Sequence, residues 1–431
     1  MMEQFLLGVS RECITPAIGG QLYGYRPDLF SNALEDDLTA TAFYFRQGSQ
    51  EAVMVSITVC LINTDLARQL QEKISDAVGI SVDKILLSAT HTHSGPNTAG
   101  AYGWGDIDRD YCDSILIPKV VNAVRAAKEK LQSVRMGMAQ GQSLVGINRR
   151  QLFANNSIGL GQNPWGPFNP TMTVLSFRGE DGQIVGNLIH YGCHGTAAGA
   201  NQEISRDWSG QMTDALERET GGITSFFNGP EGDVGPRLSN GYTTGDITYV
   251  RELGKMAAAD VLRIYRTMDG FRDATLSAGT AEAKVPLKPR MPEAEAKEML
   301  QQYLGNTVNI MGQIRYHLEN VLAAWEKNLP QLSHYSFPQT VVGLGNCVFA
   351  AFPFELFSEV GMRIDGCFPE HQVLSLSNTN GSEGYFVTED ALCRGGYEVD
   401  MHLYGHVQTY GINADWELMK ATVANIQKII G

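Results

Sequence analysis

Apolar runs of strand length alternate along the chain with amphipathic segments of helix length, and this alternation limits the folds that the chain can adopt. Residues 39–48, TATAFYFRQG, and residues 51–60, EAVMVSITVC, are predicted strands. Residues 64–79, TDLARQLQEKISDAVG, form a predicted amphipathic helix. Because strands interleaved with helices bury both faces of a sheet, we expect a layered α/β fold with a mixed β-sheet core flanked by helices.

The alternation continues to the C-terminus. Further strands are predicted at residues 84–93, 134–141, 172–179, 184–194, 223–236, 340–357 and 372–380. Further helices are predicted at residues 111–131, 209–219, 249–265, 292–328 and 413–430. No low-complexity stretch, repeat or long linker interrupts this sequence pattern, so we expect a single domain over residues 1–431.

Composition excludes several classes of partner. The net charge of −14 argues against a nucleic-acid backbone or an anionic membrane surface, because both attract basic proteins. The N-terminal residues lack a secretory signal pattern, and no run approaches the ~18 apolar residues of a membrane span. The seven cysteines are scattered and form no CxxC pair. We therefore expect a cytoplasmic protein with a small-molecule substrate and no transmembrane segment, and composition leaves an oligomer open.

Polar clusters follow several of the apolar runs, and the first is His91-Thr92-His93. On an extended segment, residues i and i+2 point to the same side, roughly 6.5–7 Å apart along the chain. Two imidazoles on one side can bind one ion, with Zn–N bonds of about 2.0–2.1 Å. Alternatively, each ring hydrogen-bonds a backbone carbonyl and has no ligand.

Two further clusters follow predicted strands in the middle of the chain. His190 and His194 are four residues apart, and either one could complete a site with His91 while the other packs. Residues 226–237, FFNGPEGDVGPR, place Glu231 and Asp233 in a tight loop whose backbone N–H groups could meet an oxyanion. Taken alone, this segment is a turn.

The last cluster lies in the C-terminal third. Glu355 follows the apolar run VFAAFPF, where a carboxylate costs several kcal/mol unless it is paired or bound to a metal. A salt bridge to an arginine would satisfy Glu355 equally well. Residues 395–405, GGYEVDMHLYG, add Tyr397, His402 and Tyr404.

Together with three further motifs, these clusters resemble, in order, the catalytic N-terminal domain of the neutral/alkaline non-lysosomal ceramidases. The motifs are GVSRECITPAIGGQLYGY (8–25), SATHTHSGP (88–96), GINRR (146–150), ISRDWSG (204–210), NGPEGDVGP (228–236), PFELF (353–357) and GYFVTEDALCRGGYE (384–398). Members of this family commonly continue into a C-terminal immunoglobulin-like domain, for which we expect no counterpart in this chain.

The resemblance implies one Zn²⁺ ion and a set of residues around it. The implied metal ligands are His91, His194 (favoured over His190), Glu355 and Tyr397. The implied catalytic residues are His93 as a proton shuttle, Arg149 facing the substrate and Tyr410 supporting an oxyanion. The implied substrate-binding residues are Asn228, Asp233 and Gly235. Such a zinc ion would activate a water molecule for hydrolysis of an amide bond.

Gly235 departs from the family pattern, because ceramidases have an active-site serine at this position. A glycine can neither attack a substrate nor hydrogen-bond a substrate hydroxyl through its side chain. We therefore expect water to be the nucleophile and a soluble N-acyl compound, rather than membrane ceramide, to be the substrate. Two alternatives are a zinc hydrolase for an ester or glycosidic bond of a polar, sugar-derived metabolite, and a non-catalytic metal-binding or ligand-binding homologue.

Overall fold

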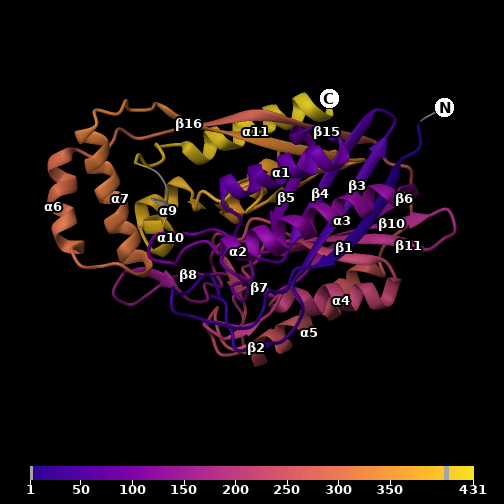
Figure 1. Cartoon of the computed structure of the whole chain (residues 1–431), viewed down its shortest axis with the longest axis horizontal. Coiled ribbons are helices and arrows are strands. Elements are labelled where there is room, and N and C mark those ends of the chain that lie inside the picture. The colour runs from indigo at the N-terminus through magenta and orange to yellow at the C-terminus, as the bar shows by residue number, and fades with distance from the viewer. Residues whose placement is uncertain (1–2, 402–406) are drawn as a thin grey trace.

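The chain folds around an eight-stranded mixed sheet and a smaller four-stranded sheet (Figure 1). The computed structural model describes residues 3–401 and 407–431. The order of strands across the large sheet is β13 (Ile223–Asn228), β11 (Ile184–Tyr191), β10 (Thr171–Gly179), β6 (Gln132–Gln142), β1 (Leu6–Cys13), β3 (Thr39–Gln47), β4 (Gln50–Ile57) and β5 (Ile85–Ala89). This mixed sheet with flanking helices confirms the predicted fold class.

The large sheet consists of two halves that diverge from a corner. Strands β1 and β6 pair only through Leu6–Leu7 and Gln132–Ser133, close to the start of each strand. Away from the corner the two halves come together again. The Ser56 hydroxyl of β4, next to the edge strand β5, donates to the Phe226 carbonyl of the edge strand β13 at 2.6 Å. Strands β5, β11 and β13 therefore all end on the side of the molecule away from the corner, and this side contains the site described below.

The smaller sheet closes the core between the two halves. Its strand order is β15 (Leu276–Pro286), β16 (His334–Leu344), β17 (Cys347–Ala351) and β19 (Gln372–Leu376). Side chains alternate between faces along these strands, as the period of two in a strand requires. In β17, Phe349 packs with Phe43 and Phe177 of the large sheet, whereas Val348 and Ala350 face the opposite side.

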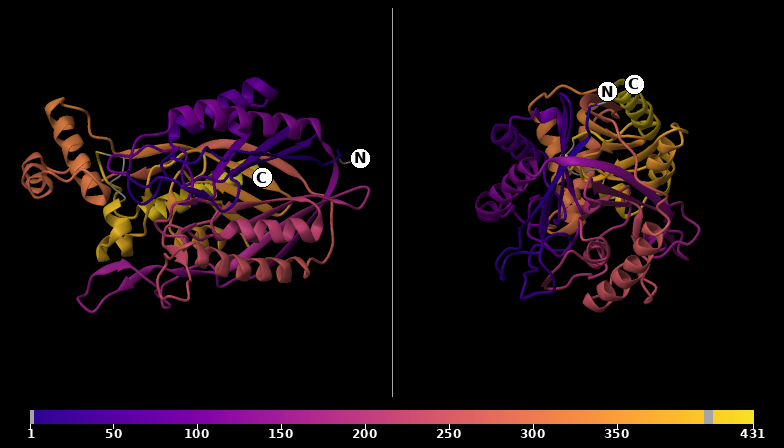
Figure 2. Two further views of the ribbon diagram at one scale, coloured as in Figure 1. Left: turned by 60° about the horizontal axis from the view of Figure 1, so that its bottom comes forward. Right: turned by 90° about the vertical axis from the view of Figure 1, so that its right-hand side faces the viewer.

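Helices cover the outer faces. Helices α1 (Thr64–Val78) and α3 (Ile117–Glu129) cover the β1–β3–β4–β5 half, and α4 (Trp208–Thr220) and α5 (Ile247–Tyr265) cover the other half. Figure 2 (left) shows the two helix pairs on opposite sides of the molecule. Helices α8 (Ser358–Asp365) and α11 (Ala414–Ile430) cover the smaller sheet. No helix in the described ranges is long and apolar enough to cross a membrane.

A helical hairpin projects from this body (Figures 1 and 2). We predicted one helical region over residues 292–328, but the structure divides it into α6 (Glu293–Tyr303) and α7 (Asn309–Glu326). Gly305, with a φ of 91°, lies in the turn between them, and this backbone conformation favours glycine. The hairpin has its own small apolar cluster, which includes Leu318 and Val321.

Short elements connect the main layers. Short strands form the two-stranded ribbons β2 (Ala33–Leu34) with β12 (Glu203–Ile204), β7 (Gly146–Asn148) with β14 (Val234–Pro236), β8 (Arg150–Leu152) with β9 (Ile158–Leu160), and β18 (Glu355–Leu356) with β20 (Tyr385–Phe386). The remaining helical turns are η1 (Val82–Lys84), α2 (Arg109–Tyr111), η2 (Cys112–Leu116), α9 (Glu389–Arg394) and α10 (Tyr397–Met401).

Candidate metal centre

Three side chains from separate parts of the chain meet beyond the strand ends. His91 follows β5, His194 follows β11 and Glu355 begins β18 just after β17. The Glu355 Oε2 atom lies 3.0 Å from His194 Nε2 and 3.4 Å from His91 Nε2. All three side chains are buried, and their ligand atoms lie within 4.8 Å of one another.

Backbone carbonyls fix the tautomers of both histidines. His194 Nδ1 lies 2.8 Å from the Glu231 carbonyl oxygen and 3.1 Å from that of Val234. His91 Nδ1 lies 3.0 Å from the carbonyl oxygen of Cys60. Because a carbonyl oxygen only accepts, each Nδ1 carries a proton and donates it. Each Nε2 faces the common point, where a neutral ring offers its lone pair.

The spacing fits a tetrahedral zinc site. Ligand atoms about 2.0–2.1 Å from one ion in tetrahedral geometry lie about 3.3 Å apart, close to the two distances measured from Glu355. A second grouping joins Cys60, His91 and His93. In that grouping the Cys60 sulfur faces Nδ1 of His91 at 3.7 Å, and this nitrogen already donates to a carbonyl. The first grouping is therefore the one with free ligand atoms.

The protonation states of most of the candidate ligands suit the binding of a cation. Burial, together with Arg149 and His91, lowers the pKa of His194 to about 3, so its imidazole is neutral. Burial raises the pKa of Glu355, but His91 and His194 outweigh burial, and the pKa ends well below its usual range. Burial lowers the pKa of His91, yet Cys60 and Glu355 leave it well above its usual value. The His91 proton balances the negative charge of Glu355. A divalent ion bound here would balance that charge instead.

His93 lies beside the three candidate ligands. Its Nε2 atom is 3.3 Å from His91 Nε2, and the two ring centroids are 4.8 Å apart. The backbone is not extended as we predicted, because the φ of His91 is 67°, yet both rings still reach the same point. Gly24, with a φ of 125°, allows this packing, since a Cβ there would lie 2.2 Å from His93 Nδ1. Burial and the two neighbouring histidines lower the pKa of His93 well below its usual value.

Arg149 lies between β7 and β8, and its side chain extends toward the cluster. Its Nη2 atom donates to the Tyr385 hydroxyl at 2.9 Å, and its Nε donates to Glu398 Oε1 at 2.9 Å. Arg150 holds the other oxygen of Glu398 at 2.6 Å. The Arg149 side chain is buried, so its charge is presented to the cluster with little screening by water.

Tyr385 is the site residue that sequence reasoning missed. It pairs directly with Glu355 between β18 and β20, and its hydroxyl lies 3.5 Å from His194 Nε2. Tyr410, which we predicted for the oxyanion role, packs instead among Phe354, Phe386 and Tyr335. Tyr385 does occur in the family-like motif of residues 384–398, but residue spacing could not select it over other tyrosines.

Tyr397, the fourth predicted ligand, faces the same cluster. Its ring centroid lies 6.0 Å from that of Tyr385, and the Arg149 guanidinium carbon is 6.0 Å from the ring. Burial and the nearby Glu355 carboxylate raise the pKa of Tyr397. His402 and Tyr404 lie outside the described residues.

His190, the alternative second histidine, hydrogen-bonds a backbone carbonyl outside the cluster. Its Nε2 atom lies 2.8 Å from the Ser375 carbonyl oxygen, so this nitrogen donates and is unavailable to a metal.

Asn228 and Asp233, predicted to contact substrate, both have internal partners. Asn228 hydrogen-bonds the backbone of Cys193 and Thr90, which joins the loops of His194 and His91.

The carboxylate of Asp233 holds Ser358 and Asn148 together. It accepts from the Ser358 backbone at 2.7 Å, from the Ser358 hydroxyl at 3.0 Å and from the Asn148 amide at 3.2 Å. The Asp233 carbonyl accepts from the Arg149 backbone at 2.8 Å. This geometry favours a supporting role for Asn228 and Asp233 over the predicted substrate contact.

Gly235 lies on β14, opposite Ile147 of β7, and its missing side chain leaves no vacant space. A Cβ at this position would lie 2.7 Å from the Thr243 Cβ and 3.4 Å from the Thr243 hydroxyl oxygen. Thr243 is buried, and its carbonyl accepts from the Thr196 hydroxyl at 3.1 Å. Thr243 therefore occupies the space beside Gly235.

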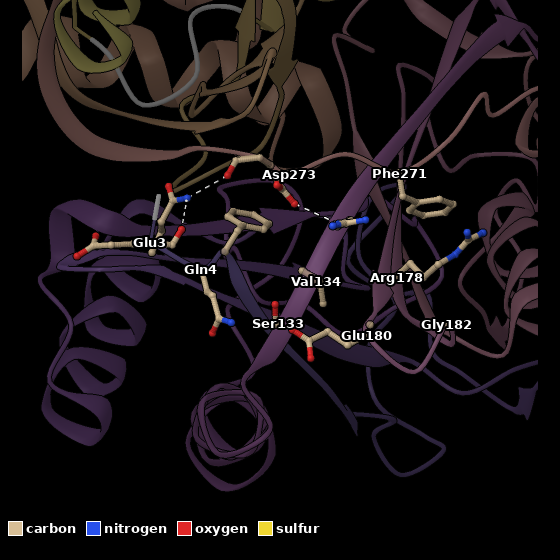
Figure 3. Close-up of a pocket in the computed structure, with 14 residues that line it drawn as sticks. Glu3, Gln4, Ser133, Val134, Arg178, Glu180, Gly182, Phe271 and Asp273 are labelled. Atoms are coloured by element: carbon tan, nitrogen blue, oxygen red, sulfur yellow. Dashed lines mark hydrogen bonds and ion pairs between the residues drawn. The ribbon is translucent and has the colours of Figure 1, made fainter. Parts of the chain in front are cut away.

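A large surface cavity lies at the opposite end of the sheet, near the corner (Figure 3). It has a volume of about 630 Å³, and its lining includes Phe5, Val134, Arg178 and Phe271. The Arg178 guanidinium carbon lies 3.7 Å from the centre of the Phe271 ring. Phe5 and Val134 belong to the starts of the chain segments that form the corner, so this cavity is separate from the metal cluster.

Comparisons with known proteins point to one family. Neutral ceramidase of Pseudomonas aeruginosa is 22% identical over 247 residues, which cover 52% of this chain and 36% of that protein. Neutral ceramidase A of Dictyostelium discoideum is 26% identical over 248 residues, which cover 51% of this chain and 34% of that protein. The alignments thus span about a third of the length of these curated relatives.

The fold matches as well. The crystal structure of neutral ceramidase from Pseudomonas aeruginosa superposes with a TM-score of 0.75 and 18% identity, over 99% of this chain and 75% of that one. At this identity the superposition establishes the fold alone. The sequence profile described as neutral/alkaline non-lysosomal ceramidase, N-terminal, matches residues 5–250, more than half of the chain. The chain therefore belongs to the neutral/alkaline non-lysosomal ceramidase N-terminal domain family.

Proposed function

We propose that the protein is a zinc-dependent hydrolase that cleaves an amide bond of a soluble N-acyl compound. The observation that carries this proposal is the convergence of His91 Nε2, His194 Nε2 and a Glu355 oxygen on one point, with the Nδ1 atom of each histidine turned to a backbone carbonyl. Two imidazoles and a carboxylate are a donor set suited to Zn²⁺. Zinc bound there would supply a Lewis acid that brings the pKa of water near 7.

The residues around the candidate ligands would transfer the proton and stabilise the developing negative charge. His93, with its lowered pKa, is a neutral base that accepts a proton at Nε2 and returns it to the leaving nitrogen. Arg149 and Tyr385 donate hydrogen bonds toward the cluster, where negative charge develops on the substrate oxygen. Tyr397 borders the same space, as a further ligand or as part of its wall.

Membership of the ceramidase family supports the amide bond as the target. Thr243 fills the space beside Gly235, so the structure offers no extra room there for a polar, sugar-derived substrate. The presence of His93 and Arg149 beside an intact donor set supports an enzyme over a non-catalytic homologue.

The test combines metal analysis with product analysis. The purified protein is loaded with zinc, and its metal content is compared with that of His91→Ala. Both proteins are then assayed by mass spectrometry on soluble N-acyl amino acids, short-chain N-acyl amino alcohols, matched esters and glycosides. We expect one zinc ion per chain, release of free amine by the wild type, and neither in the variant. Zinc binding with ester or glycoside products alone would overturn the amide assignment, and absence of zinc binding would overturn the whole proposal.

A further inference from the structure

The opening motif of the sequence, GVSRECITPAIGGQLYGY (8–25), has no role in the proposed reaction. Its last residues lie beside the chain that follows His93, because the Tyr23 N–H donates to the Gly95 carbonyl at 3.0 Å. The motif therefore ends next to the metal cluster, and its last residue, Tyr25, has a place there that the reaction does not explain.

The ring of Tyr25 packs against His93. The two ring centroids are 5.1 Å apart and the ring planes are inclined by 61°, which is an edge-to-face contact. Gly24 lies against the same imidazole, since a Cβ there would lie 2.2 Å from His93 Nδ1. Tyr25 and His93 are half-buried, whereas His91 and His194 are buried, so this contact forms the outer side of the cluster.

Packing, rather than hydrogen bonding, holds the His93 ring in place. Its Nδ1 atom is buried and has no hydrogen-bond partner among the described residues. The Nδ1 atoms of His91 and His194, by contrast, donate to backbone carbonyls. The orientation of the His93 ring therefore depends on the groups packed against it.

The Tyr25 side chain supplies bulk beside His93 and no charge. Burial raises the pKa of Tyr25 well above its usual value, so the phenol stays protonated. Its hydroxyl lies 3.5 Å from the Thr196 carbonyl oxygen, at the long limit of a hydrogen bond. Since Thr196 follows His194 by two residues, the ring extends from His93 to the loop of a candidate ligand.

We propose that Tyr25 is a positioning residue for His93, whose imidazole it holds against the candidate ligands. This inference rests on the proposed function, in which His93 transfers a proton. Proton transfer needs the two heavy atoms within hydrogen-bond reach, about 2.6–3.2 Å. A misplacement of about 1 Å can lower a rate on the order of 100-fold. Without the Tyr25 ring, the imidazole would have room to turn away from the cluster.

The first test measures kcat and KM of zinc-loaded variants on whichever N-acyl amino acid or amino alcohol the wild type cleaves fastest. Tyr25→Ala removes the ring, and we expect kcat to fall about 10–100-fold with KM and zinc content unchanged. Tyr25→Phe keeps the ring and should recover most of this loss. In a His93→Ala background, Tyr25→Ala should cause no further fall in kcat, since both residues act through one contact.

The second test needs no turnover. Diethyl pyrocarbonate acylates neutral imidazoles, and peptide mapping by mass spectrometry gives a separate rate for each histidine. In the metal-free protein, we expect His93 to react faster in Tyr25→Ala than in the wild type or in Tyr25→Phe. His334, which is exposed on β16, should react at the same rate in all three proteins.

The matched control is Tyr265→Ala, which removes a half-buried tyrosine ring from α5. We expect this control to lower the thermal midpoint while kcat and the rate of His93 modification stay unchanged. A kcat and a His93 modification rate in Tyr25→Ala equal to those of the wild type would overturn the inference. An equal fall in kcat from Tyr25→Ala with and without the His93 imidazole would also overturn it.

The two tests separate this inference from the proposed function. If the wild type released no free amine while modification of His93 still depended on the Tyr25 ring, the proposed function would fail and the positioning of His93 would stand.

Discussion

The two ends of the large sheet differ in almost every property that usually marks a functional site. The corner end has a wide cavity, an exposed Arg135–Asp273 ion pair and the Arg178–Phe271 contact (Figure 3). The other end has buried imidazoles and carboxyl groups packed against one another and backed by carbonyl oxygens. The candidate site is therefore marked by buried donor atoms and not by the volume of a cavity.

The largest expected effect separates these two ends directly. Glu355→Gln removes the charged ligand, and we expect loss of stoichiometric zinc and a fall in kcat/KM on the order of 10³-fold. Arg178→Ala, at the corner, should leave kcat/KM within twofold of the wild type. Steady-state kinetics and metal analysis of both variants check this contrast. A large loss of activity in the corner variant alone would reverse our assignment of the two ends.

The next effect distinguishes two tyrosines near the metal end. Tyr385→Phe removes a hydroxyl that contacts Arg149 and lies near His194, so we expect kcat to fall roughly 10²–10³-fold. Tyr410→Phe, in the aromatic cluster, should change kcat less than about threefold. The zinc content of both variants should equal that of the wild type, which separates an effect on oxyanion stabilisation from an effect on metal binding.

A stability effect is expected for His190, which lies near the end of β11. Burial lowers the pKa of His190 from 6.5 to about 4, so the folded state binds fewer protons than the unfolded state between these values. Its contribution to the free energy of unfolding is complete above pH 6.5 and is lost as pH falls toward 4, by roughly 3 kcal/mol in total. His190→Gln cannot titrate, so the difference between variant and wild type should change across this window.

Urea unfolding at a series of pH values measures that difference. Because other buried groups titrate in the same range, only the wild-type minus variant difference is informative. A difference that is constant from pH 4 to 6.5 would contradict a neutral, buried His190.

The smallest expected effect concerns Gly235. Gly235→Ser places a Cβ 2.7 Å from that of Thr243, and such overpacking typically costs about 1–3 kcal/mol of unfolding free energy. The double variant Gly235→Ser/Thr243→Gly should recover most of this loss, because it removes the crowding side chain. A single serine variant as stable as the wild type would show that the β14 ribbon moves aside freely.

Much of the fold could be predicted from the sequence, because local periodicity dictated the elements. The strand at 39–48 and the helix at 64–79 lie within two residues of their predicted bounds. The division of the large sheet at the β1–β6 corner could not be predicted, since it depends on pairing between distant segments. The strand predicted over 84–93 ends at Ala89, where the positive φ of His91 turns the chain.

The site was predictable only in part, for a similar reason. Motif resemblance selected His91, His194 and Glu355, which the structure brings together. Thr243 fills the space at Gly235 from a loop eight residues later, a contact with no local sequence signature. The cytoplasmic location and the single domain over 1–431 stay predictions.

The family profile ends at residue 250, and the residues of the candidate metal centre lie on both sides of that point. A protein cut there would yield two pieces, one with both imidazoles and the other with the acid. Neither piece alone could hold the ion firmly, so uptake would depend on the concentration of the two pieces and on how often they meet. Zinc binding would then measure how far the two pieces have reassociated, and the cut protein could serve as a split-protein sensor.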